Sequence, residues 1–290
     1  MVPQPPSILH RTFLPSGDVE GGPLLHRTLA GRSADGSLIA IGTVRVADEG
    51  DRRMAAVRAI IAPSWRGRGI GRALLSWQDA TALLVLVGAP GEPGVIGVPI
   101  AASMVDRRRL YTAAGFSAAT RLEVVRRHLG DSPLEGRTSR VHGEAAPGWC
   151  ARPLESGDTD AVLELLRDLP DPHAFLMHAL THAELLALVE PGLSRVVLEG
   201  DTVRGYVLVV PLASRPGADS AVILAISLPG AAPEVRDGVL ADTSRTLWSA
   251  GYREVMLALT PARAREWARS LTAQSFQGIA SDPLYTIELH

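Results

Sequence analysis

The chain has 290 residues, a length that predicts two domains rather than one. Apolar residues make up 46% and charged residues 21%, so each half contains enough apolar surface for a core. The formal net charge of −2 gives no general attraction to nucleic acid or to an anionic membrane. Apolar runs are broken by Gly and Pro, which excludes a membrane span.

A single cysteine, Cys150, excludes an internal disulfide and suits a reducing compartment. The segment Met1–Pro6 is proline-rich and lacks the apolar core of a leader peptide. We therefore expect a cytoplasmic protein, with Cys150 as a small buried side chain rather than a nucleophile.

The first informative segment is a glycine-rich turn between a predicted buried strand, 54–61, and a predicted helix, 73–87. The turn reads Ala-Pro-Ser-Trp-Arg-Gly-Arg-Gly-Ile-Gly-Arg over residues 62–72. Glycines let a backbone approach a ligand closely, and the amides at a helix N-terminus attract anions. Three arginines, Arg66, Arg68 and Arg72, add positive charge. The turn therefore predicts a phosphate-binding loop.

Three kinds of phosphate loop compete for this pattern. A P-loop requires a lysine, and the chain has none. A Rossmann turn requires a glycine where this chain has Arg72. The third pattern, Arg-x-x-Gly-x-Gly, is met by Arg66, Gly69 and Gly71. It resembles the acetyl-CoA pyrophosphate loop of the GCN5-related N-acetyltransferases.

A second motif supports the same resemblance. Residues 106–116 read Asp-Arg-Arg-Arg-Leu-Tyr-Thr-Ala-Ala-Gly-Phe, which is similar to that family's helix-to-strand signature. Gly115 fits the left-handed position after a helix, and Phe116 would begin a core strand. The run 107–109 is read as a solvated helix face, with contact to the 3′-phosphate of CoA as the other possibility. The resemblance covers about residues 24–127.

The resemblance implies an N-acetyltransferase that uses acetyl-CoA as acyl donor, needs no metal and transfers acetyl directly to the amine of a small molecule. Tyr111 would be the general acid for the leaving thiolate. Backbone amides at the end of the strand would hold the pantetheine arm, and the loop would hold the pyrophosphate. The donor-binding residues implied are Ile60, Ile61, Ala62, Arg66, Gly67, Arg68, Gly69, Ile70, Gly71 and Arg72.

The general base is not identified by the sequence. Many members of the family carry a glutamate on the strand where this chain has Arg58, which stays protonated and could instead bind an acidic group of the acceptor. The candidates are Ser103 acting through a water, Glu123, His26 and Asp106. A non-catalytic acyl-CoA-binding module, or transfer of another acyl group or to a hydroxyl, remains open.

The second half predicts the same fold again. Residues 130–148 read as a linker, so the expected domains are 1–129 and 149–290. The pattern favours helices over 158–169, 180–189, 235–250 and 262–271, and strands over 149–154, 194–199, 203–211, 220–228, 254–259 and, as two strands, within 275–290. We expect two tandem folds of α/β (α+β) class, each a mixed, mostly antiparallel sheet flanked by helices.

The second copy lacks the motifs that carry the chemistry. Its loop contains Pro233, which has no amide proton, and the acidic residues Glu234 and Asp237. Aligning Phe276 with Phe116 places Ser275 at Gly115 and Leu271 at Tyr111. The spacing of His178 and His182 could place two imidazoles on one helix face, but no accompanying glutamate favours a metal site. We expect one acetyl-CoA per chain, and a monomer or loose homodimer without nucleic acid or membrane partners.

Overall fold

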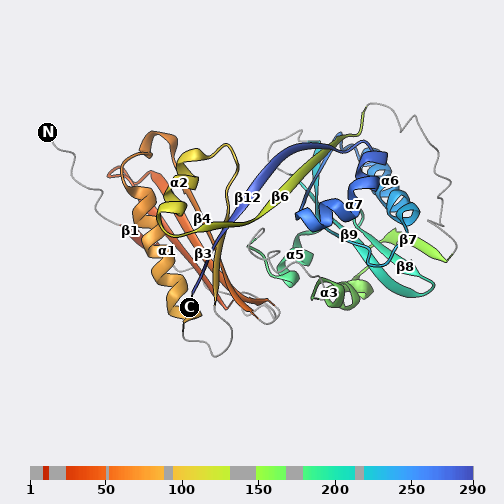
Figure 1. Ribbon diagram of the computed structural model, residues 1–290, viewed down its shortest axis with the longest axis horizontal. Helices are drawn as coiled ribbons and strands as arrows, with labels where there is room; N and C mark the ends of the chain where they lie inside the picture. The colour runs from red at the N-terminus through yellow and green to blue at the C-terminus, as the bar shows by residue number, and fades with distance from the viewer. Residues whose placement is uncertain are drawn as a thin grey trace. The chain divides into compact units, whose positions relative to one another are not determined.

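The computed structural model describes residues 9–12, 24–49, 52–87, 94–130, 148–167, 179–212 and 219–289. The chain divides into two compact units (Figure 1). The first unit comprises residues 1–119, 171–181 and 283–290, and the second comprises residues 120–170 and 182–282. The linker expected at 130–148 lies outside the described residues, apart from Gly130 and Gly148.

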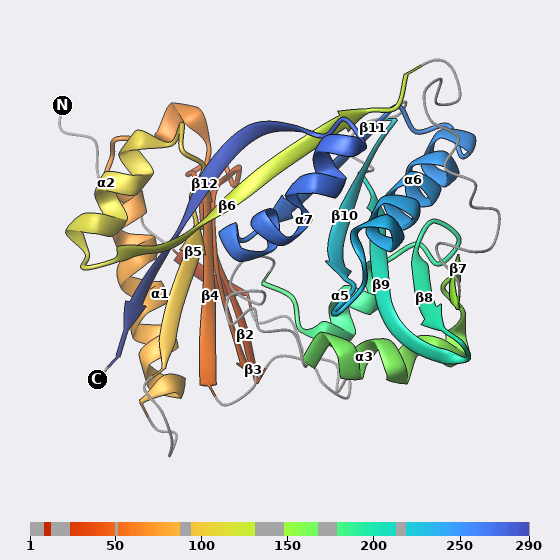
Figure 2. The ribbon, with the colours of Figure 1, turned by 45° about the vertical axis from the view of Figure 1, so that its right-hand side comes forward.

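The first unit is a mixed sheet covered by two helices on one side (Figure 2). Its strands follow one another as β1 to β5, antiparallel except for the parallel pair β4 and β5. Their bounds are β1 Leu9–Thr12, β2 Leu25–Arg32, β3 Leu38–Glu49, β4 Arg52–Ile61 and β5 Val95–Pro99. The helices are α1, Ile70–Leu86, and α2, Val105–Ala113, with a short 3₁₀ turn over Pro63–Trp65.

The last strand of the chain completes this first sheet. Strand β12, Gln277–Glu288, pairs with β5 in antiparallel register from Leu284 opposite Pro99 to Glu288 opposite Val95. Tyr285, Ile287 and Leu289 then pack against the core under α1. The first unit therefore contains the end of the chain as well as its beginning.

The second unit receives a strand from the first half of the chain. Strand β6, Ser117–His128, pairs with β11 from Glu123 opposite Leu259 to His128 opposite Glu254. The remaining strands are β7 Trp149–Pro153, β8 Arg195–Glu199, β9 Thr202–Pro211, β10 Ser220–Ser227 and β11 Glu254–Leu259. The helices are α3 Thr159–Arg167, α5 His182–Leu188, α6 Pro233–Ser249 and α7 Pro261–Ala273.

The fold class predicted from the sequence is confirmed, because each unit holds a mixed, mostly antiparallel sheet with helices. The expected division at residues 129 and 149 differs from the compact units. Most of β6 belongs to the second unit and the end of β12 belongs to the first, so the two halves of the chain exchange a strand. The two strands expected within 275–290 are one strand, β12. Cys150 is exposed rather than buried, because it lies on β7 at the edge of its sheet.

The two units repeat one local structure at the ends of α2 and α7. Gly115 and Ser275 both have positive φ, of 93° and 59°. In each unit the amide of the following phenylalanine donates to a carbonyl five residues earlier, Phe116 to Tyr111 at 3.1 Å and Phe276 to Leu271 at 2.9 Å. This shared helix ending supports the predicted alignment, in which Leu271 occupies the place of Tyr111.

Candidate functional site

The glycine loop precedes an exposed helix N-terminus in the first unit. Gly67 and Gly69 have φ of 75° and 84°, in the left-handed region that glycine alone adopts without strain, and Gly69 is the N-cap of α1. The first helical hydrogen bond runs from the Ala73 amide to the Gly69 carbonyl at 3.2 Å. The amides of Ile70 and Gly71 come before that bond, so they have no acceptor within the helix.

The charges around this helix start favour an anion. Arg66, Arg68 and Arg72 are exposed, and the first turn of α1 contains no acidic residue. The Arg66 Nε donates to the Ile61 carbonyl at 3.2 Å, which ties the loop to the end of β4. The Arg68 guanidinium lies 4.8 Å from the ring centroid of Trp65, so Trp65 packs beside the loop.

Strands β4 and β5 separate just before the loop. They are paired only from Met54 opposite Val95 to Ala56 opposite Gly97, although β4 continues to Ile61. Ile60, near the end of β4, is 70% exposed. The separated ends leave the backbone of β4 without a neighbouring strand on its β5 side, where an extended ligand can bind.

The register with β3 decides which backbone groups of β4 face this opening. The Ala62 amide donates to the Ile39 carbonyl at 2.8 Å, so Ala62 bonds toward β3, and by alternation Ile60 does the same. Ala59 and Ile61 then direct their amides and carbonyls toward the opening. The prediction that the Ala62 amide holds a ligand is therefore wrong, and for Ile60 the register points the same way; of the three predicted amides, Ile61 faces the opening.

Tyr111 lies in the last turn of α2 and is 3% exposed. Its ring contacts Phe116 edge-on, with centroids 5.1 Å apart. Burial raises the pKa of Tyr111 to about 12, Arg107 opposes that rise, and Asp79 adds to it. The hydroxyl therefore stays protonated across the ordinary pH range and can donate a hydrogen bond to a developing anion.

Ser103 and Tyr111 lie at opposite ends of α2. Ser103 is exposed in the turn that precedes the helix, whereas Tyr111 is buried in its last turn. A joint role of the two residues in catalysis stays a prediction.

The remaining candidates for the base are dispersed. Asp106 is exposed in the first turn of α2, and His26 lies on β2. Glu123 belongs to the second unit, where it accepts a hydrogen bond from the Ser281 hydroxyl at 3.0 Å. His178 lies outside the described residues. Within the described part of the chain, no cluster of three His, Cys, Asp or Glu side chains forms that could hold a metal.

Two charged residues, Asp79 and Arg107, act on Tyr111 in a way that the sequence did not predict. Asp79, on α1, has a raised pKa because of burial, and its Oδ1 has no hydrogen-bond partner among the described residues. Arg107, on α2, donates from Nη2 to the Ala59 carbonyl at 2.8 Å. A signal for Asp79 was available, because it lies four residues after Leu75 and three before Ala82 on the buried face of α1.

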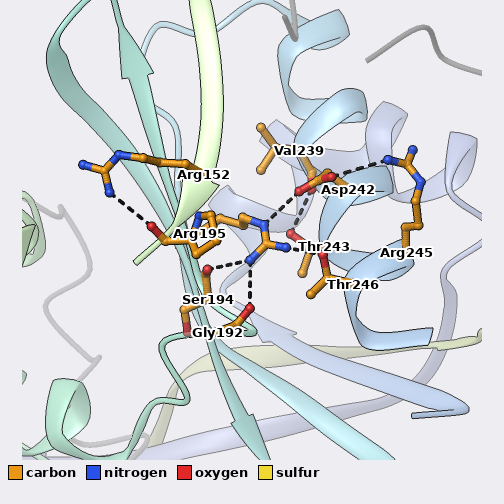
Figure 3. A network of polar contacts seen from close by, with 10 residues as sticks. Arg152, Gly192, Ser194, Arg195, Val239, Asp242, Thr243, Arg245 and Thr246 are labelled. Carbon is orange, nitrogen blue, oxygen red and sulfur yellow. Dashed lines mark hydrogen bonds and ion pairs between the residues drawn. The ribbon is translucent and has the colours of Figure 1, made fainter. Parts of the chain in front are cut away.

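The corresponding helix start in the second unit has a different character. Helix α6 begins with Pro233 and carries Glu234 in its first turn, where Glu234 accepts from Arg269 at 3.2 Å. Further along α6, Asp242 pairs with the buried Arg195 of β8 at 2.8 Å (Figure 3). Arg195 also donates to the carbonyls of Gly192 and Ser194 and to the Thr246 hydroxyl. These contacts connect α6 to β8 and are structural.

Two buried tyrosines give the chain a defined response to alkaline pH. The pKa of Tyr111 is about 12 in the folded chain, and burial raises that of Tyr206 as well. An unfolded tyrosine ionises near pH 10, so the unfolded state releases its protons first and folding stability falls as pH rises above that value. For Tyr111 alone the loss is about 3 kcal/mol once the pH exceeds 12.

We expect the free energy of unfolding to decrease between about pH 9 and about pH 11, and to decrease less in Tyr111→Phe. Urea titrations at the two pH values measure the difference. An equal decrease in the free energy of unfolding for the wild type and for Tyr111→Phe would show that the Tyr111 hydroxyl is solvated rather than buried.

Comparison with known proteins is consistent with this geometry. No family model matches the chain, and no curated protein matches it in sequence. Among solved structures, a GCN5-related N-acetyltransferase from Sphaerobacter thermophilus is 21% identical, with a TM-score of 0.65 over 93% of this chain and 82% of that one. A tandem GNAT protein from the clavulanic acid biosynthesis pathway is 14% identical, with a TM-score of 0.59 over 91% of this chain and 83% of that one.

A putative acetyltransferase from Pyrococcus horikoshii is 12% identical, with a TM-score of 0.56 over 91% of this chain and 74% of that one. In the described residues, no helix combines the length and apolar character of a membrane span. The sequence identities of 12% to 21% limit the likeness to the backbone. The chain therefore has the fold of the GCN5-related N-acetyltransferases.

Proposed function

We propose that the chain is an acetyl-CoA-dependent N-acetyltransferase that acts on an amine of a small molecule. The observation that carries this proposal is the loop of the first unit. Its left-handed glycines, the amides at the start of α1 that have no acceptor within the helix and three exposed arginines suit a pyrophosphate. The opening between β4 and β5 lies next to it and suits the pantetheine arm.

The second unit is proposed to bind no acetyl-CoA, so that the chain is an intact copy followed by a degenerate one. Support comes from Pro233 and Glu234 at the start of α6, which remove an amide donor and add a negative charge. Leu271, at the place of Tyr111, has no hydroxyl. We further propose a cytoplasmic monomer or loose homodimer that requires no metal, nucleic acid or membrane.

In the proposed reaction the acceptor amine attacks the thioester carbonyl carbon. The carbon–sulfur bond breaks, the sulfur takes the electron pair, and the amine releases a proton to water. Tyr111 would donate a hydrogen bond to the sulfur. Because its pKa of about 12 exceeds that of an alkyl thiol, near 8.5, Tyr111 stabilises the thiolate without losing its proton completely.

A non-catalytic acyl-CoA-binding module is the second candidate. The observation in its favour is the burial of Tyr111, which is 3% exposed and packed against Phe116. Thiol release from acetyl-CoA, measured over a panel of amines and of hydroxyl compounds, separates the two functions. Parallel assays with longer acyl-CoA thioesters identify the acyl group. Acetyl-CoA binding without thiol release for any acceptor would favour the binding module.

Tyr111→Phe is expected to lower kcat while leaving the affinity for acetyl-CoA nearly unchanged. The hydroxyl acts on charge that develops only in the transition state, so its loss reduces kcat by about 100-fold or more. Single-turnover thiol release and calorimetry measure the two quantities. Wild-type turnover by Tyr111→Phe, where chemistry limits the rate, would assign Tyr111 to the core.

A further inference from the structure

Arg107 extends from α2 to the open side of β4. The sequence favours a solvated helix face for residues 107–109, but the Arg107 side chain is half-buried, unlike the exposed Arg109. Its Nη2 donates to the Ala59 carbonyl at 2.8 Å. An arginine has five donors, and this bond uses one of them.

The Ala59 carbonyl lies where β4 has no neighbouring strand. The β3–β4 register directs Ala59 toward β5, and β5 is paired with β4 only as far as Ala56. The guanidinium is therefore held at the opening between the two strands. It contributes a fixed positive charge to the inner part of the opening, whereas Arg66 binds the next carbonyl on the same side, that of Ile61, nearer the loop.

Arg107 and Tyr111 also lie on the same face of α2. They are four residues apart, the spacing at which helix side chains are neighbours. The Arg107 charge lowers the pKa of Tyr111, whereas Asp79 raises it. The cation and the phenol are thus near enough to act on one charge.

We propose that Arg107 stabilises the thiolate of CoA, with its charge held at the opening of the sheet by the Ala59 carbonyl. This inference rests on the proposed acetyl transfer and identifies a further residue of that same site. During transfer the sulfur gains the electron pair of the carbon–sulfur bond, and the acceptor nitrogen forms the new bond to the acetyl carbon. A guanidinium beside the sulfur lowers the energy of that charge before a proton reaches it.

The direct test measures the pKa of the thiol in bound CoA, which requires no acceptor. Thiolate absorbance in the ultraviolet is followed against pH below the range where tyrosine ionises, in a Cys150→Ser background that removes the chain's one cysteine. Wild type, Arg107→Met and Arg107→Lys are compared. Arg32→Met, an exposed site on β2, is the control for loss of charge.

The bound thiol is expected to have a pKa at least about one unit higher in Arg107→Met than in wild type. Arg107→Lys keeps the charge and should recover most of the shift, and Arg32→Met should show none. If an active acceptor is found, kcat should fall at least about tenfold in Arg107→Met, with a smaller change in KM.

The outcomes separate the two proposals. CoA that binds Arg107→Met with the wild-type thiol pKa would overturn the role of Arg107 and leave the proposed function intact. Failure of both CoA and acetyl-CoA to bind the wild-type chain would overturn the proposed function itself. If Arg107→Met does not fold, a thiol pKa in Arg107→Gln equal to that in Arg107→Lys would likewise overturn the role of the charge.

Discussion

Gly69→Glu is expected to abolish acetyl-CoA binding, whereas Gly230→Glu is expected to leave it unchanged. Gly69 caps α1, and a glutamate there adds a side chain and a negative charge where the pyrophosphate would lie. Juxtaposed like charges cost several kcal/mol, so affinity should fall by at least about 100-fold. Calorimetry on the full chain measures the affinity and the number of sites, which should be one for the wild type.

Gly230 is a closely matched control. Gly69 and Gly230 have positive φ, of 84° and 72°, and a Cβ on either meets no atom within 4 Å. Both variants therefore introduce the same backbone strain and the same charge, and both lie in the turn before a long helix. Equal losses of affinity, or two equivalent sites in the wild type, would contradict an acetyl-CoA site at the first loop.

Removing residues 283–290 is expected to unfold the first unit and to eliminate acetyl-CoA binding. Five residues of β12 pair with β5, and Leu284 is completely buried. Ile287 lies close to Gly115, since a Cβ on that glycine would be 3.3 Å from Ile287 Cδ1. Without this segment the core around Tyr111 would lose the packing of Tyr285, Ile287 and Leu289. The truncated chain should show a smaller unfolding transition in calorimetry.

A single substitution in β12 also tests whether the stability of the first unit depends on this strand. Leu284→Ala removes buried apolar volume and should destabilise the first unit by about 2–5 kcal/mol. Ile279→Ala, on the same strand at 43% exposure, is the control and should destabilise the protein much less.

Residues 1–130 expressed alone lack β12, so this fragment should be molten or self-associating. A truncated chain with wild-type affinity for acetyl-CoA would refute this account.

Local features of the chain were predictable because local rules govern them. The glycines at 67, 69 and 115 have positive φ, a backbone conformation that few other residues adopt. The helix after the loop was expected over 73–87 and runs from Ile70 to Leu86, because the glycines hid its first turn. Helical periodicity placed α3, α6 and α7 within two residues of their observed ends. Even Ser275, a poor residue for positive φ, was placed by its alignment with Gly115.

Features that depend on strand pairing were not predictable. Which amides of β4 are free depends on its register with β3, and the pattern of residues 54–61 carries no such information. The position of Arg107 likewise depends on where the Ala59 carbonyl points. Strands β6 and β12 are both 12 residues long, and nothing local tells either one which sheet to join.

The exchange of these strands determines when the protein can fold during its synthesis. On the side away from β4, β5 pairs with residues 284–288 of β12. A ribosome makes the first unit's other described strands before it makes those of the second unit, and this edge of β5 stays open until β12 has been made. Domains of a nascent chain generally fold as they emerge, amino-terminal part first. In this protein the amino-terminal sheet is completed only after the strands of the second unit have been made, which reverses that order.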